Sequence, residues 1–391
     1  MFLPFELSGN GEALFGIAQK IATEVARPHA GEVDRAARFP YESVQALKDA
    51  RLMGAYVPIA LGGEGATAAD IAAVAYALGQ ACSNTAMVFA MHQIQVACLV
   101  HHGLEVESLR AYAERVASEQ LVLASATTEL GVGGDVRTSL CAVDLTEHEF
   151  SLHKNAPVIS YADHADAILV TARRSADAAS SDQVIVVVDR GDATLTRTLP
   201  WDTLGMRGTC SNGYVLEARG SRDRVLPEPY ADISSRTMLP VTHIWWASLW
   251  LGMATDAVNS TRSHLRALAR KSAGDTPQIA SEVALLFSEL EMVSATIAAA
   301  LRLYESVSPD PVGLSSPGFV LRMNSLKTSV SSSVIRIITQ ALNIVGIAAY
   351  RNDSDNSIAR LLRDAHSADL MVHNERILQN SGRLLCVYKG Q

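Results

Sequence analysis

The hydrophobic pattern divides the chain into three zones. From residue 11 to about 120, apolar positions recur at three- and four-residue intervals, as in segment 14–25, and predict helices. Pro28 follows that segment and is expected to end its helix. From about 121 to 216, short apolar runs lie between turn residues and predict strands. After about residue 231 the helical pattern returns in long, alanine-rich segments that are typical of a helical bundle.

Four short apolar runs define the strand zone. They cover residues 121–123, 150–152, 167–171 and 184–188. The polar segment 175–182 predicts the tip of a hairpin. Together the zones predict an α+β, mainly α fold with three parts: an N-terminal α-helical domain at 1–120, a central β-domain at 121–230 and a C-terminal helical bundle at 231–391.

Composition and charge exclude several classes of protein. With 48% hydrophobic and 19% charged residues among 391, the chain is expected to bury a sizeable core. A net charge of −8 without any basic run argues against a nucleic-acid partner. The apolar segment 244–258 contains Ser248, Thr255 and Asp256, so it is too short and too polar to cross a membrane.

Cysteines and histidines predict neither a disulfide framework nor a metal site. The five cysteines are scattered, odd in number and without a CxxC spacing. The adjacent His101 and His102 point apart on a helix, and no metal ligands join them at a suitable spacing. The N-terminus shows no basic region followed by an apolar run, so no secretory signal is expected. These features predict a soluble, cytoplasmic protein.

Four separated segments carry a resemblance to a known family. They are TTELGVGGD at 127–135, KNAPVISYADHAD at 154–166, LGMRGT at 204–209 and ARLLRDA at 359–365. In sequence and spacing they resemble the acyl-CoA dehydrogenase superfamily over essentially the whole chain. The resemblance implies a homotetramer in which FAD lies between the β-domain and a C-terminal four-helix bundle.

The candidate flavin-binding residues combine hydroxyl groups with a glycine-rich turn. A flavin enzyme hydrogen-bonds the polar atoms of the ring and leaves one ring face open to substrate. The Thr128 hydroxyl and the backbone amides of the turn suit the pyrimidine end, and the resemblance places the Ser160 hydroxyl beside N5. The glycines alone would equally suit an ordinary tight turn. The resemblance implies these cofactor-binding residues: Thr127, Thr128, Gly133, Gly134, Val158, Ser160, Arg270, Gln278, Asn343 and Gly346.

Several positions depart from the family pattern. Val158 replaces the aromatic residue that often stacks near the flavin, and Gly134 replaces the serine of the turn. The arginine–aromatic–glycine motif that contacts a neighbouring subunit's FAD is reduced to RKSAG at 270–274, and QxxGGxGY is reduced to NIVGIAAY at 343–350. These changes predict looser binding of FAD than is usual for the family.

The largest departure concerns the catalytic base. Dehydrogenation of an acyl thioester needs a carboxylate within reach of its α-carbon. Counting on from RDA, the resemblance puts Val372 at the usual glutamate position, against the substrate. It puts Thr242, beside His243, at the alternative position. A dehydrogenase would need another base, and the candidates are His373, Glu375 and His243.

Three functions remain open. The α,β-dehydrogenation of an acyl thioester leads because it is the family's usual reaction, and it would pass electrons to an electron-transfer partner. The superfamily also contains monooxygenases in which reduced flavin, supplied through a flavin reductase, reacts with O₂. These need no α-proton base, and His366 and His373 would suit contacts to their substrate. The third function is a non-catalytic flavin-binding subunit.

Polar and aromatic residues within apolar helices are the remaining candidates. His92 lies with Gln93 and Gln95 in the apolar stretch 91–100, and buried polar groups need partners. A substrate could supply them, which makes His92 a candidate substrate contact, and helix–helix hydrogen bonds would serve equally. The three tryptophans at 245, 246 and 250 either line a ligand cavity or pack in the bundle core.

Overall fold

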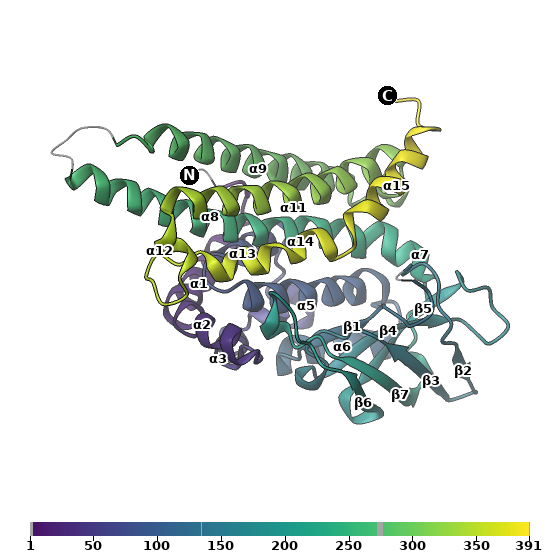
Figure 1. Ribbon diagram of the computed structural model, residues 1–391. Coiled ribbons are helices and arrows are strands. Elements are labelled where there is room, and N and C mark those ends of the chain that lie inside the picture. The colour runs from purple at the N-terminus through teal and green to yellow at the C-terminus, as the bar shows by residue number, and fades with distance from the viewer. Residues whose placement is uncertain (1–2, 134, 272–276, 391) are drawn as a thin grey trace.

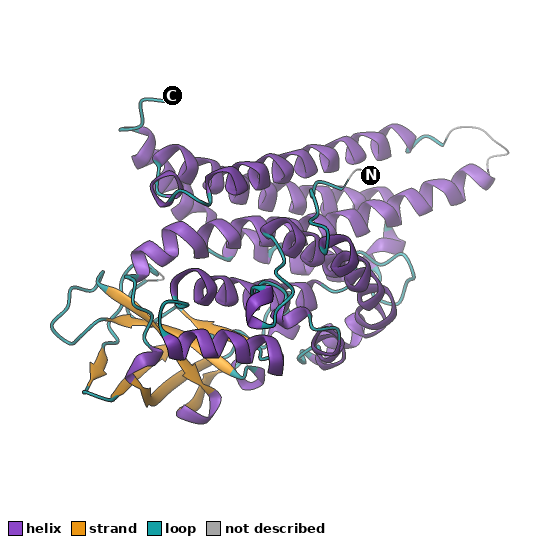
Figure 2. Cartoon of the chain, turned by 180° about the vertical axis from the view of Figure 1, so that it is seen from behind, coloured by secondary structure: helices purple, strands orange, loops and turns teal. Residues whose placement is uncertain are grey.

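The computed structural model describes residues 3–133, 135–271 and 277–390. Helices, strands and helices follow one another along the chain (Figure 1), so the predicted α+β, mainly α fold is confirmed. The strands gather at one side of the molecule, and the long C-terminal helices extend across the rest (Figure 2).

The N-terminal helices surround two helices that are almost wholly buried, α4 and α5. The bounds are α1 Gly11–Ile21, α2 Arg27–Ala36, α3 Tyr41–Asp49, α4 Ala68–Gly79, α5 Ser83–His102 and α6 Glu107–Glu119. α4 begins at a capping box, in which the Thr67 hydroxyl accepts from the Asp70 N–H and the Asp70 carboxylate accepts from the Thr67 N–H. The alanine-rich surface of α4 lets its neighbours approach from every side.

Pro28 lies inside the first helical run, so the prediction that it ends the helix is wrong. α1 continues through a π-helical turn at Ala22–Ala26 directly into α2, and Pro28 occupies the first turn of α2. The adjoining π-turn and the first turn of a helix tolerate a residue without an N–H donor. The run ends at Ala37, which is left-handed with φ 48°.

The strands form, among the described residues, a three-stranded sheet in the order β1-β4-β5 and a four-stranded sheet in the order β2-β3-β7-β6. The bounds are β1 Leu123–Ala126, β2 Val143–Leu145, β3 Glu149–Ala156, β4 Ala167–Arg173, β5 Gln183–Asp189, β6 Ala193–Leu199 and β7 Gly213–Ser221. The predicted runs fall in or beside β1, β3, β4 and β5, and segment 175–182 joins β4 to its antiparallel neighbour β5. The sequence did not predict β6, because most of its residues are exposed and it lacks an apolar run.

The C-terminal helices build the bundle around α8. The bounds are α7 Tyr230–Ile233, α8 Leu239–Lys271, α9 Ala280–Val307, α10 Pro311–Leu314, α11 Pro317–Val345, α12 Ile347–Tyr350, α13 Ala359–Ala365, α14 Ser367–Leu370 and α15 Asn374–Leu385. α8 packs against α4, α9 and α11. Its crossing with α4 is close, because a Cβ at Gly252 would lie 2.3 Å from the Tyr76 carbonyl oxygen and one at Gly79 2.4 Å from that of Leu249.

The outer face of the bundle retains exposed apolar residues. α9 is long and apolar enough to cross a membrane by length and composition alone, and here it packs against α8 and α11. Large apolar side chains nevertheless face outward from α9, at Leu285 and Met292, and from α15, at Leu378 and Leu385. The C-terminal end of α8 and the start of α9 project beyond the other helices (Figure 1).

Candidate active site between the β-strands and the C-terminal helices

The glycine-rich turn after β1 is held in place by a buried carboxylate. Gly131 and Gly133 have positive φ angles of 93° and 59°, which glycine adopts without steric cost. Glu129 is buried, and its carboxylate accepts from the Ser139 hydroxyl and the Cys141 N–H, both at 2.7 Å. These bonds connect the beginning of the turn to residues 139–141, which follow it.

A buried lysine anchors the same turn to the sheets. The Lys154 side chain of β3 is completely buried, and its Nζ donates to the Thr171 carbonyl oxygen at 2.6 Å and lies 3.5 Å from the Glu129 carboxylate. Burial lowers the pKa of Lys154, and the Glu129 charge opposes that shift. The two residues therefore form an internal ion pair beneath the turn.

A row of hydroxyl groups connects the turn at 204–209 to Ser160, which lies in the segment after β3. The Thr128 hydroxyl donates to the Val158 carbonyl oxygen at 2.8 Å. The Ser211 hydroxyl donates to the Ser160 oxygen at 2.8 Å and lies 2.8 Å from that of Thr209. Among the described residues Ser160 donates to no acceptor, so its half-buried hydroxyl is free to donate to a ligand.

The C-terminal side of the site is the short segment between α14 and α15. Arg376 of α15 donates to the Gly133 carbonyl oxygen, so this segment and the glycine-rich turn meet. Val372 has φ 49°, a left-handed conformation that is uncommon for a β-branched residue and that the surroundings must enforce. Its side chain is 38% exposed and carries no group that could accept a proton.

A second buried lysine enforces that conformation. Lys327 of α11 is completely buried, and its Nζ donates to the Val372 carbonyl oxygen at 2.9 Å and to the Asn374 amide oxygen at 2.6 Å. Asn374 in turn donates to the Asp369 carboxylate at 2.6 Å. Burial lowers the pKa of Lys327 to about 8. Lys327, Asn374 and Asp369 form the clamp that fixes residues 371–374; the pattern of α11 did not single out this lysine.

The candidate base His243 is buried and neutral. Its Nδ1 lies 3.1 Å from the Met323 carbonyl oxygen, so Nδ1 carries the proton and Nε2 is an acceptor. Burial and the nearby Lys327 lower the pKa of His243 to about 4. Its Nε2 shares one face of α8 with the indole N–H groups of Trp246 and Trp250, and none of the three has a hydrogen-bond partner among the described residues.

The other candidate bases lie on the outer surface. His373 is exposed, and its Nδ1 accepts from the Glu375 N–H at 3.3 Å, which makes it the N-cap of α15. The exposed Glu375 carboxylate accepts from Gln379 one turn later. His366, the further candidate for a substrate contact, is exposed as well.

Residues 11–120 match the family described as acyl-CoA dehydrogenase, N-terminal domain, and residues 234–371 match acyl-CoA dehydrogenase, C-terminal domain. The chain belongs to the acyl-CoA dehydrogenase superfamily. It is therefore a flavin-dependent oxidoreductase, as the four segments implied, and flavin is its cofactor.

Similar proteins fall into two functional groups within this superfamily. One relative is cyclohex-1-ene-1-carbonyl-CoA dehydrogenase of Geobacter metallireducens, 23% identical over 94% of this chain and 96% of its own. Another is the amino sugar nitrososynthase DnmZ of Streptomyces peucetius, 26% identical over 86% of this chain and 84% of its own. The fold is shared with the dibenzothiophene monooxygenase TdsC from Paenibacillus, with a TM-score of 0.81, 18% identity, and coverage of 96% and 97% of the two chains.

The residues of the β-side fit a flavin ring. The proton of the Ser160 hydroxyl has no acceptor in the described part of the chain, and the glycine-rich turn presents backbone N–H groups. A Cβ at Gly133 would meet nothing within 4 Å, so space is open beside the turn. Thr127, Thr128 and Val158 are half-buried around the same segment, and Gly134 lies outside the described residues. This donor set of hydroxyls and amides suits the polar edge of a flavin.

The remaining predicted cofactor residues lie at the other end of the bundle. Arg270 lies in the last turn of α8 and Gln278 precedes α9, at the projecting end of the two helices (Figure 1). Asn343 is exposed near the end of α11, and Gly346 caps that helix with φ 75°. One chain therefore does not bring these residues to the turn at 127–135, and their assignment to a neighbouring subunit's FAD stays a prediction.

The prediction that His92 contacts substrate is contradicted. His92 is completely buried, with Nε2 at 2.7 Å from the Met53 carbonyl oxygen and Nδ1 accepting from the Leu123 N–H at 2.9 Å. Both ring nitrogens are therefore used to join α5 to β1 and to residues 52–54. Burial lowers the pKa of His92 to about 4, so it stays neutral. The sequence equally allowed His92 to form hydrogen bonds between helices, and the observed structural hydrogen bonds are closer to that alternative.

Metal ligands do not gather in the described part of the chain. No group of three or more His, Cys, Asp or Glu side chains there could hold a metal ion.

Proposed function

We propose that this protein is a flavin-dependent monooxygenase of the acyl-CoA dehydrogenase superfamily. The observation that carries the proposal is Val372, an apolar side chain on a clamped backbone at the position where the resemblance expects a catalytic base. Abstraction of an α-proton needs such a base, whereas oxygenation with reduced flavin and O₂ does not.

The residues of the site would divide the work as follows. Bound flavin supplies the redox chemistry. Thr128, the glycine-rich turn and Ser160 would hold the polar edge of the ring, and the Lys327 clamp keeps segment 371–374 in place against it. The unpartnered nitrogen atoms of His243 and Trp246 would meet polar atoms of the substrate, because a buried polar group without a partner is costly.

Acyl-thioester dehydrogenation is the second candidate. It is supported by relatives whose names describe acyl-CoA dehydrogenases and by Glu375, a carboxylate three residues from Val372 at the start of α15. For this reaction Glu375, His373 or His243 would have to reach the α-carbon of a bound thioester. The exposure of Glu375 and His373, and the low pKa of His243, weigh against each.

Anaerobic mixing with thioesters separates the two candidates. The flavin-loaded protein is mixed with butyryl-, octanoyl- and palmitoyl-CoA without oxygen, and the flavin absorbance is followed. We expect no bleaching, because no carboxylate stands at position 372. Bleaching by any of the three would establish dehydrogenation and overturn the proposal.

Oxygen incorporation tests the proposal directly. The protein is supplied with reduced flavin by a flavin reductase and exposed to ¹⁸O₂ with indole, dibenzothiophene or an amino sugar, the compound classes named for similar proteins. We expect one labelled oxygen atom in the product of the accepted class, detected by mass spectrometry. Absence of both labelled product and thioester bleaching would favour a non-catalytic flavin-binding subunit.

We further propose that the cofactor is FAD and that the protein is a cytoplasmic homotetramer. Support for assembly comes from the exposed apolar residues of α9 and α15 and from cofactor residues that one chain leaves apart from its own turn. Light scattering at micromolar concentration should give four times the chain mass of 41.8 kDa. A monomer would contradict the assembly.

A further inference from the structure

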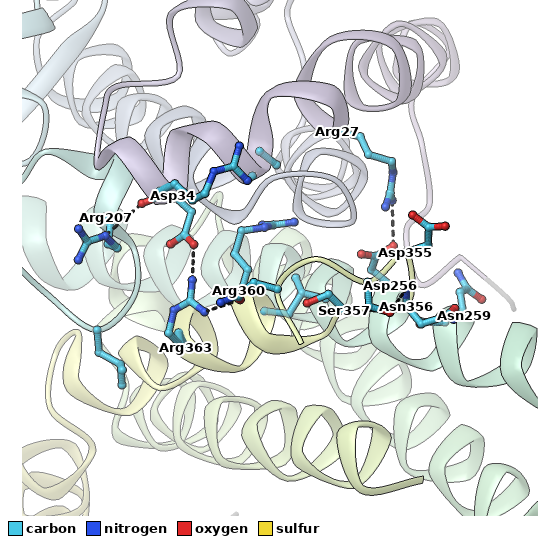
Figure 3. Close-up of a pocket in the computed structure, with 18 of the residues that line it drawn as sticks. Arg27, Asp34, Arg207, Asp256, Asn259, Asp355, Asn356, Ser357, Arg360 and Arg363 are labelled. Atoms are coloured by element: carbon cyan, nitrogen blue, oxygen red, sulfur yellow. Dashed lines mark hydrogen bonds and ion pairs between the residues drawn. The ribbon is translucent and has the colours of Figure 1, made fainter. Parts of the chain in front are cut away.

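A polar cavity lies apart from the residues that would hold the flavin. It has a volume of about 930 Å³, opens to solvent, and is lined by α2, residues 203–207, α8, segment 352–357 and α13 (Figure 3). This volume is within the range of small-molecule sites, but the lining is polar and charged rather than apolar. None of the predicted flavin or substrate residues lines it.

One end of the cavity is built from arginines placed around a single aspartate. Arg363 of α13 pairs with the Asp34 carboxylate of α2, and Arg207 donates through Nε to the Asp34 carbonyl oxygen at 3.1 Å. Arg360 donates to the Ala81 carbonyl oxygen at 3.2 Å. Figure 3 shows these three side chains gathered around Asp34. The backbone contacts position Arg207 and Arg360 before any ligand arrives.

Two arginines of the cavity, Arg35 and Arg360, keep guanidinium groups that no close ion pair uses up. Five arginines and three aspartates line the cavity, and Asp202 and Asp364, just outside the lining, lie 3.3 Å from Arg207 and 3.8 Å from Arg360. The Arg360 Nη1 is buried and makes no hydrogen bond to the residues that the structure describes; the Asp364 carboxylate lies 3.8 Å from it. Arg35, on the same side of α2 as Asp34, is exposed and has no ion-pair partner within the described ranges. Guanidinium groups in this state favour an anion, and phosphate oxygens match their geometry.

The other end of the cavity offers amide and hydroxyl groups beside a paired aspartate. Asn259 and Asp256 of α8 face Asn356 and Ser357 of the segment before α13 (Figure 3). The Arg27 side chain closes this end by pairing with Asp256 at 2.8 Å. Amide, hydroxyl and carboxylate groups of this kind bind the hydroxyl groups of a sugar.

We propose that this cavity binds a phosphomonoester of a sugar or nucleoside. Its phosphate lies among Arg207, Arg360 and Arg35, and its hydroxylated body extends toward Asn356 and Asn259. The two ends of the cavity thus match the two ends of one ligand class. The site differs from the proposed flavin site, since neither Ser160 nor Ser211 lines the cavity.

Calorimetric titration of the flavin-loaded protein tests this inference. AMP and glucose 6-phosphate are the probes, and adenosine and glucose are their matched compounds without phosphate. We expect saturable one-to-one binding of at least one phosphomonoester, weakened by added salt, and no binding of the compounds without phosphate. The flavin absorbance must stay unchanged, because displacement of flavin by AMP would place the binding at the flavin site and overturn the inference.

Variants at the two ends then locate the ligand. Arg35→Ala, an exposed residue without a structural partner, should weaken phosphomonoester binding about tenfold, the usual worth of one charge-assisted contact. Asn356→Ala should weaken it by about threefold to fivefold. Arg322→Ala, an exposed arginine of α11 outside the cavity, is the matched control and should bind as the parent does. No binding of either probe, or equal affinities for parent and Arg35→Ala, would overturn the inference.

Discussion

The two sides of the proposed flavin site differ in what they retain of the family pattern. The β-side keeps its hydroxyl and amide donors, with Thr128 and Ser160 in place and the turn tied down by Glu129. The C-terminal side keeps its backbone shape, fixed by Lys327, but presents Val372 where a base is expected. In the proposed site, separate residues would hold the flavin and abstract a proton, and the proposed monooxygenase needs only the first set.

Each side contains a buried lysine, and the two lysines differ in how their charges are balanced. Lys154 faces a carboxylate, so its charge is balanced within the protein. Lys327 is bonded to neutral oxygen atoms, those of Val372 and Asn374, and its nearest compensating charge is that of Asp369. The clamp at the C-terminal side should therefore be the more sensitive of the two to pH.

Restoring the base should give the largest effect. Val372→Glu introduces a carboxylate on the clamped backbone, and a positioned base is worth about 10²–10⁴-fold in rate. We expect anaerobic flavin reduction by an acyl-CoA to appear in this variant and to be absent from Val372→Gln, the matched control.

The same assay examines the surface candidates. His373→Ala and Glu375→Gln should leave the oxygenation rate of the parent within about twofold, because neither residue is used as a base. If the parent is a dehydrogenase, one of these changes should instead lower flavin reduction by about 10²–10⁴-fold. That outcome would show that the C-terminal side supplies a base after all, and the difference between the two sides of the site would disappear.

Breaking the ion pair under the glycine-rich turn should cost the most stability. Glu129→Gln leaves Lys154 buried without its carboxylate, and removing one member of a buried pair costs about 3–5 kcal/mol. Urea unfolding followed by circular dichroism should show a lower midpoint at an unchanged slope. Glu217→Gln, in an exposed pair with His153, is the control and should change stability by less than about 0.5 kcal/mol. Equal midpoints for the two variants would show that the turn does not depend on Glu129.

The Lys327 clamp should make stability rise with pH. The pKa of Lys327 is about 8 in the folded protein and 10.5 when unperturbed, so between these values the unfolded chain binds more protons. The free energy of unfolding should therefore increase from pH 8 to pH 10.5, by at most about 3 kcal/mol for this group. The measurement is the difference between parent and Lys327→Met in urea unfolding at pH 7.5 and pH 10. A difference that does not change with pH would show that Lys327 titrates normally.

The smallest expected effect concerns the Ser160 donor. Ser160→Ala removes one hydrogen bond to the flavin, worth about 1 kcal/mol, and should weaken flavin binding about fivefold. Fluorescence titration of the flavin-free protein measures this change. Ser151→Ala, on β3 away from the turn, is the matched control. Unchanged affinity in Ser160→Ala would mean that the hydroxyl does not contact the ring.

The sequence supports different kinds of prediction for the two sides of the site. The flavin contacts of the turn 127–135 and Ser160 rest on short local motifs, and the base position at Val372 rests on counting along RDA; both stay predictions. His92 was predicted wrongly as a substrate contact, since a polar residue in an apolar helix does not reveal its partners. Those partners, the Met53 carbonyl and the Leu123 N–H, lie 39 and 31 residues away.

By itself, the sequence determined the order of helices, strands and helices, the family and the absence of a carboxylate at position 372, because periodicity and motifs are local properties of the chain. Only the tertiary structure decided which residues hold the site together. The Lys327 clamp joins residues 45 and 47 positions apart, and the arginines around Asp34 come from segments up to 329 positions apart. Such contacts arise when separate helices pack side by side, and no local pattern records which side chains then meet.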